Sequence, residues 1–151
     1  NALAGVSEWW KALPSGTILT PHPGEMSRLV GDSVTTKHVQ ANREDLARSH
    51  AALWGAVVVL KGACTLIGTA GARPLVSTRG NPGMATAGMG DVLSGVIGGL
   101  LAQGMSLAEA TLAGVCLHAC AGDRAALAGE RGLLARDVIA ELRPLLNLAT
   151  L

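Results

Sequence analysis

A glycine-rich stretch between residues 80 and 95, G-N-P-G-M-A-T-A-G-M-G-D-V-L-S-G, constrains this chain more than any other part of it. Five glycines surround a single carboxylate, Asp91, and the stretch runs into an apolar segment that predicts a helix. Glycine lets a backbone approach a ligand closely, and the first turn of a helix attracts anions. We therefore expect the amides of Gly88, Met89 and Gly90 to hold a phosphate or an oxyanion, with Asp91 beside them.

The carboxylate of Asp91 allows two interpretations. An acid next to an anion-binding loop costs electrostatic energy unless a metal, a cation or a transferable proton is involved, which indicates chemistry. The alternative is a structural loop in which Asp91 serves as the helix N-cap. Glycine patterns are common outside functional sites, so this stretch alone does not separate the two.

The composition predicts one folded domain and argues against nucleic acid as a partner. The chain of 151 residues is 49% hydrophobic and 15% charged, which suits one domain with a real core. It contains no Phe or Tyr, so the core must be built mainly from aliphatic side chains. A net charge of +1 without a basic block argues against nucleic acid as a partner.

The cysteines and the apolar runs suggest a cytoplasmic protein. Three cysteines form an odd number in a chain without a signal-like segment, which favours a reduced compartment. Cys116 and Cys120 would share a helix face while His118 points away, because successive helical residues are about 100° apart. We therefore predict no metal site there. The longest apolar run, residues 92–102, is too short to cross a bilayer.

The order of elements predicts an α/β fold with a mostly parallel sheet. The predicted strands cover residues 17–20, 56–60, 64–70 and 74–77, the last two as a hairpin-like pair. The predicted helices cover residues 1–13, 25–30, 35–52, 91–103, 106–127 and 135–146. Within 35–52 the charged residues, Arg43 among them, are expected to face water. Ser106 and Glu109 have the spacing of a capping box.

Three loops follow strands or open helices at what should be one edge of the sheet, where α/β proteins bind ligands. They are residues 22–25, 61–65 and 88–91. Each also has an ordinary structural interpretation. Lys61 could be a solvated lysine at the end of a strand, and His22 could stabilise a turn that contains proline. Glu25 could be an acid in the first turn of a helix, where the helix dipole favours a negative charge. The sequence before Lys61 lacks the glycines of a Walker loop.

Together these loops resemble a known family. T-P-H-P-G-E (20–25), K-G-x-x-T (61–65) and N-P-G-M-A-T-A-G-M-G-D-V-L-S-G (81–95) are similar to motifs of the ADP/ATP-dependent NAD(P)H-hydrate dehydratases, a branch of the ribokinase-like superfamily. L-H-A-C-A-G-D (117–123) and G-E-R-G-L-L-A-R-D-V-I (129–139) resemble its C-terminal helices. The resemblance implies that residues 1–151 are the C-terminal portion of a three-layer α/β/α ribokinase-like domain. Asn1-Ala2-Leu3 resembles the end of a family segment, so we expect the domain to be incomplete at its N-terminus.

The resemblance implies a metabolite-repair lyase. Hydrated NADH or NADPH would be returned to the reduced dinucleotide at the expense of ADP or ATP, by phosphoryl transfer and loss of phosphate. Asp91 would act as the general base, and His22 and Asp91 would contact the hydrate. Glu25 would contact Mg²⁺ through water. The nucleotide would be bound by Lys61, Gly62, Ala63, Cys64, Thr65 and Gly90.

Some alternatives stay open at this point. A vitamin-precursor kinase of the same fold shares the glycine–aspartate loop, although such kinases more often have asparagine at position 22. A non-catalytic nucleotide-binding fragment is another alternative. Ala87 stands where many family members have glycine, which a negative φ would accommodate. Ala- and Gly-rich helices suit either homo-oligomer contacts or a core, and an epimerase domain could precede this one in the parent protein.

Overall fold

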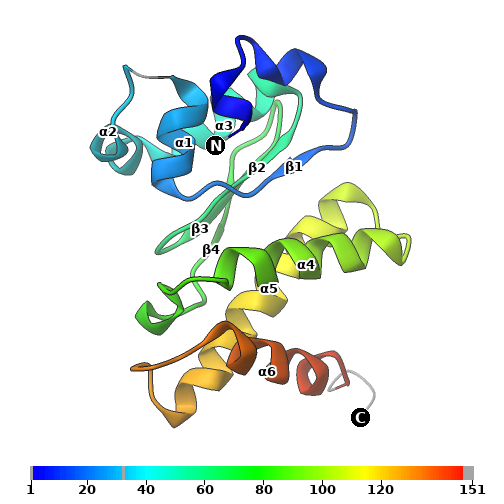
Figure 1. The fold of residues 1–151 in the computed structure, drawn as a ribbon. Helices are drawn as coiled ribbons and strands as arrows, with labels where there is room; N and C mark the ends of the chain where they lie inside the picture. The colour runs from blue at the N-terminus through cyan, green and yellow to red at the C-terminus, as the bar shows by residue number, and fades with distance from the viewer. Residues whose placement is uncertain (1, 32, 148–151) are drawn as a thin grey trace. The chain divides into compact units, whose positions relative to one another are not determined.

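A computed structural model describes residues 2–31 and 33–147, and the chain divides into two compact units, Asn1–Val76 and Ser77–Leu151 (Figure 1). Asn1, the first residue of the segment that resembles the family, lies outside the described residues.

The sheet has four short strands in chain order, β1 (Ile18–Leu19), β2 (Val57–Leu60), β3 (Thr65–Gly68) and β4 (Leu75–Ser77). Strands β1 and β2 are parallel, whereas β2 and β3 are antiparallel with Leu60 opposite Leu66. The α/β class and the β3–β4 pair are confirmed, but the strands present here form a mixed sheet rather than a mostly parallel one. The reason is loop length, because the few residues between β2 and β3 can only return the chain antiparallel.

Three helices separate β1 from β2 in the first unit, namely α1 (Pro23–Val30), α2 (Thr36–Ala41) and α3 (Arg43–Trp54). All four residues of β2 are buried, as a continuous β-branched run predicts. The core of this unit also contains Met26, Val39 and Trp54.

The start of the chain forms two 3-10 turns, η1 (Leu3–Gly5) and η2 (Trp9–Ala12), instead of the single helix predicted there. Glu8 interrupts the helical path with a φ of 49°. The second turn is anchored by its tryptophans. The Trp9 ring lies 4.8 Å from the Trp54 ring and 5.8 Å from the Trp10 ring, and Trp9 Nε1 donates to the Leu29 carbonyl at 3.3 Å.

The second unit is helical, with α4 (Met89–Ala102), α5 (Leu107–Ala125) and α6 (Ala135–Asn147) packed on one another (Figure 1). Two 3-10 turns, η3 (Pro82–Met84) and η4 (Ala126–Ala128), lie in its connections. The predicted capping box at the start of α5 is confirmed, because Ser106 Oγ accepts from the Glu109 amide and the Glu109 carboxylate accepts from the Ser106 amide. No helix in the described ranges has the length and apolar character to cross a membrane.

Candidate active site

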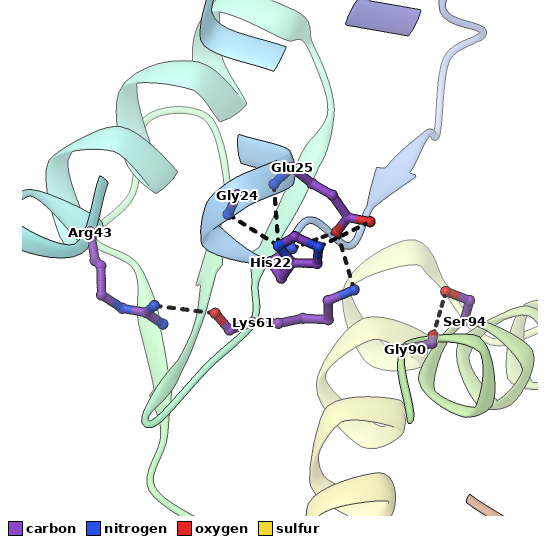
Figure 2. Close-up of polar contacts among 7 residues, drawn as sticks. All are labelled: His22, Gly24, Glu25, Arg43, Lys61, Gly90 and Ser94. Carbon is purple, nitrogen blue, oxygen red and sulfur yellow. Dashed lines mark hydrogen bonds and ion pairs between the residues drawn. The ribbon is translucent and has the colours of Figure 1, made fainter. Parts of the chain in front are cut away.

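His22 caps helix α1 at the end of β1. Its Nδ1 accepts from the amides of Gly24 at 3.0 Å and Glu25 at 3.2 Å, and the Glu25 carboxylate accepts from the His22 amide at 2.7 Å (Figure 2). Pro23 occupies the first helical position, where a missing N–H costs nothing. Because Nδ1 accepts two hydrogen bonds, the imidazole proton lies on Nε2. The Nε2 proton therefore lies on the side of Glu25, whose Oε1 is 3.6 Å from that nitrogen, and the ring is half-exposed.

Lys61 follows β2 and reaches the same carboxylate. Its Nζ lies 3.4 Å from Glu25 Oε2, and its amide donates to the Pro21 carbonyl at 2.9 Å (Figure 2). Burial acts to raise the pKa of the Glu25 carboxyl, but the bond from the His22 amide and the charge of Lys61 outweigh it and lower that pKa. The parallel pairing of β1 and β2 thus brings His22, Glu25 and Lys61 into one cluster, as predicted for a shared sheet edge.

The predicted nucleotide loop, residues 61–65, is tightly folded between β2 and β3. Gly62 has a φ of 135° and Cys64 a φ of 58°, a conformation that costs a residue with a side chain about 1–2 kcal/mol. Thr65 Oγ1 donates to the Gly62 carbonyl at 3.2 Å. The guanidinium of Arg43 also binds this loop (Figure 2). Our expectation that Arg43 faces water was wrong, because a lone arginine in a polar helix carries no signal for such a distant contact.

The glycine-rich loop opens helix α4 in the second unit. Gly88 is the N-cap, with a φ of 86°, and no side chain caps the helix. Asp91 is exposed in the first turn, so it is not the N-cap residue of the structural alternative. Ser94 Oγ donates to the Gly90 carbonyl at 3.0 Å (Figure 2). Asp91 thus lies in the first turn of a 14-residue helix, the end of a helix whose amides attract anions.

Ala87 fits the loop without strain. Among the described residues with a side chain, only Glu8 and Cys64 have a positive φ, so Ala87 meets the condition under which its extra methyl is tolerated. Glycine is required one position later, at Gly88. A Cβ at that residue would also lie 3.1 Å from the Cβ of Ala135.

Helix α5 holds the other end of the glycine-rich loop. Both carboxylate oxygens of Asp123 accept from the Gly80 amide, at 3.1 and 3.2 Å. The Asn81 side chain donates to the Gly122 carbonyl at 3.0 Å and to Asp123 Oδ1 at 3.2 Å. Asp123 belongs to the 117–123 motif, but this role could not be predicted from the sequence, because its partners lie more than forty residues away.

No group of three or more His, Cys, Asp or Glu residues in the described part of the chain is arranged to hold a metal ion. Glu25 is one carboxylate whose Oε2 already has two partners. This arrangement fits contact with a metal-bound water better than direct ligation.

Comparison with known proteins supports the family suggested by the motifs. The family model for NAD(P)H-hydrate dehydratase matches residues 2–144. A bifunctional NAD(P)H-hydrate repair enzyme of Coxiella burnetii is 53% identical over 131 residues, which cover 86% of this chain and 26% of that protein. An ADP-dependent (S)-NAD(P)H-hydrate dehydratase of Neisseria meningitidis is 46% identical over 135 residues, covering 88% of this chain and 45% of that protein.

Solved structures show the same relationship. The ADP/ATP-dependent NAD(P)H-hydrate dehydratase of Bacillus subtilis, co-crystallised with ATP and Mg²⁺, has a TM-score of 0.79 and 32% identity, covering 86% of this chain and 47% of that one. A ribokinase-like superfamily protein of Enterococcus faecalis has a TM-score of 0.71 and 32% identity, covering 90% and 46%. The chain spans less than half the length of each of these relatives. Its motifs, its fold and these matches place it, as its sequence predicted, in the ribokinase-like NAD(P)H-hydrate dehydratase family.

Proposed function

We propose that this chain takes part in the nucleotide-dependent dehydration of hydrated NADH or NADPH, returning them to NADH or NADPH. The observation that carries the proposal is Asp91, an exposed carboxylate in an uncapped first helical turn. Family membership supports it, as do two relatives: the ADP-dependent dehydratase of Neisseria meningitidis and the Bacillus subtilis dehydratase that was co-crystallised with ATP and Mg²⁺.

In the first step, Asp91 takes the proton of the hydrate's C6 hydroxyl while that oxygen attacks the terminal phosphorus of the nucleotide. The bond from this phosphorus to the bridging oxygen breaks, and the shortened nucleotide leaves. The amides of Gly88, Met89 and Gly90 stabilise the transferring phosphoryl group, since this reaction depends on positioning and charge stabilisation. A general base must lie within hydrogen-bonding reach of the proton, and the exposed carboxylate is accessible to a substrate.

The second step releases phosphate. The lone pair of the ring nitrogen forms a double bond to C6 as the C6–O bond breaks, and phosphate departs with those electrons. Loss of a proton from C5 then gives the C5–C6 double bond of the dihydronicotinamide. The net result is the removal of one water from the hydrate and the hydrolysis of one phosphoanhydride.

We assign substrate binding to the residues that the family motifs indicate. His22 donates from Nε2 to the hydrate, and Asp91 contacts it as base. The nucleotide contacts are assigned to Lys61, Gly62, Ala63, Cys64, Thr65 and Gly90. Lys61 adds a point charge for a phosphate, and Glu25 balances that charge through its ion pair.

Magnesium is proposed as the counterion of the nucleotide. Glu25 would contact it through water, while the phosphates supply the direct oxygen ligands. When bound, the ion would neutralise charge on the phosphates.

The setting of the protein is also a proposal. We expect it to act in the cytoplasm on small molecules. The bifunctional relatives support a second activity in the parent polypeptide, for which we propose the epimerase.

Coupled turnover tests the function. The full-length protein is incubated with hydrated NADH or NADPH, Mg²⁺ and either ADP or ATP, and the near-ultraviolet absorbance of the reduced nicotinamide is followed. We expect recovery that requires a nucleotide and falls by about 10²-fold or more in Asp91→Asn, with the Kd for nucleotide little changed. Asp45→Asn, which changes an exposed carboxylate on α3, is the matched control and should keep full activity.

The outcomes separate the alternatives. Nucleotide binding without recovery of NADH or NADPH would favour the non-catalytic fragment. Full activity in Asp91→Asn would reject the assigned base.

A further inference from the structure

Arg43 of helix α3 binds the main chain of the predicted nucleotide loop, residues 61–65. Its guanidinium donates to the carbonyls of Leu60, Lys61 and Cys64, each at 3.1 Å. These three carbonyls lie on both limbs of the turn between β2 and β3. One planar, charged fork therefore fixes the start and the end of the loop at once.

These bonds also set the direction of the loop amides. The C=O and the following N–H of a trans peptide point in opposite directions, and none of the described peptides is cis. Because the carbonyls of Lys61 and Cys64 point toward Arg43, the amides of Gly62 and Thr65 point away from it.

The guanidinium of Arg43 packs closely against the loop. A Cβ at Gly62 would lie 2.9 Å from Arg43 Nη1, so the loop approaches the guanidinium as closely as glycine allows. Arg43 Nη1 also donates to Gln40 Oε1 at 3.3 Å, which holds the side chain from the α2 side. Burial lowers the pKa of the guanidinium, but arginine stays charged at neutral pH.

From these contacts we propose that Arg43 is a positioning residue that holds the 61–65 loop in its nucleotide-binding shape without touching the nucleotide. The inference rests on the proposed function of this loop. Loss of the fork frees Cys64 and Gly62 from their positive-φ conformations, so the loop must be ordered again when nucleotide binds. Binding therefore weakens, while the rate with bound substrates is maintained.

Direct titration of the full-length protein with ADP and with ATP, in Mg²⁺, tests this role. Arg43→Lys keeps the charge but not the fork, and Arg43→Gln removes the charge. We expect the Kd for nucleotide to rise about tenfold or more in both variants, with kcat at saturating nucleotide within about threefold of the parent. Arg48→Lys is the matched control, since Arg48 lies on the same helix but donates to the side chain of Asp45 and not to the loop.

If Arg43 only stabilised the fold, its variants would differ from the parent in melting temperature and not in nucleotide affinity. The melting temperature would fall, but the folded molecules would bind nucleotide with the parent Kd. A folded Arg43→Lys protein with a Kd within about twofold of the parent therefore overturns the inference. If neither arginine variant folds, Gly62→Ala perturbs the same contact from the loop side, and an unchanged Kd there overturns it equally.

The test also separates this inference from the proposed function. If the parent binds nucleotide and shows the Arg43 effect but does not dehydrate the hydrate, the positioning role stands and the dehydratase proposal fails. If the parent binds no adenine nucleotide, both fail.

Discussion

Replacing Gly88 by alanine perturbs the N-cap of helix α4, where the glycine-rich loop has a positive φ. Gly88 combines a φ of 86° with close packing against Ala135, whereas its neighbour Ala87 has no such conformation. The reverse exchange, Ala87→Gly, is a matched control one residue away. The two variants change the same loop by one methyl group in opposite directions.

The structure allows the size of each effect to be estimated. A left-handed conformation costs a residue with a side chain about 1–2 kcal/mol. The added Cβ would lie 3.1 Å from the Cβ of Ala135, which requires a further small displacement. We expect Gly88→Ala to lower the free energy of unfolding by roughly 2 kcal/mol, equivalent to a fall in Tm of roughly 4–8 °C for a chain of this size. Ala87→Gly should cost only about 0.4–1 kcal/mol, through the entropy of the unfolded chain.

Thermal unfolding followed by far-ultraviolet circular dichroism measures the stability, and coupled turnover at a temperature where each variant is folded measures the activity. We expect Gly88→Ala to lower kcat about 10²-fold because it redirects the first-turn amides, and Ala87→Gly to retain activity. If Gly88→Ala melts with the parent and turns over at the parent rate, the strain argument and the role of these amides are both refuted.

Three further predictions follow from described contacts. Asp123→Ala removes both acceptors of the Gly80 amide, so kcat should fall about tenfold, as measured by coupled turnover, with secondary structure retained. Burial lowers the pKa of His50 below its ordinary value of 6.5, so the unfolded state binds the proton more tightly than the folded state. The free energy of unfolding should therefore decline as the pH falls below 6.5. His50→Gln should flatten that decline, as measured by melting curves over this pH range. Gly68→Ala should strongly destabilise the protein because the new Cβ would collide with the backbone carbonyl of Ala47 in α3. Gly98→Ala has open space around it and should stabilise α4 by about 1 kcal/mol. Chemical denaturation measures the free energy of unfolding of both variants.

Features with a local cause could be predicted from the sequence. The β-branched run of β2 predicts a buried strand because adjacent residues alone determine it. Ser106 and Glu109 cap α5 through bonds three residues apart. Parallel pairing of β1 and β2 explains why His22 and Lys61 meet Glu25, and this juxtaposition was expected from topology.

Features that depend on distant contacts could not be predicted. Arg43 binds carbonyls 17 to 21 residues away, and a helix pattern says nothing about such partners. Asp123 reaches Gly80 across 43 residues. At the start of the chain, helical spacing was misleading because Glu8 has a left-handed φ of 49°, which separates two short turns and does not continue a helix.

The cluster of Trp9, Trp10 and Trp54 has a spectroscopic consequence. These are all three tryptophans of the chain, which has no tyrosine, and they belong to the Asn1–Val76 unit. Intrinsic fluorescence therefore reports on that unit alone, and the Ser77–Leu151 unit, with Asp91 and the glycine-rich loop, emits nothing. A variant such as Gly88→Ala could melt its own unit without altering the emission spectrum. Separate fluorescence and circular dichroism midpoints would show that the two units unfold independently, and coincident midpoints would show that they unfold together.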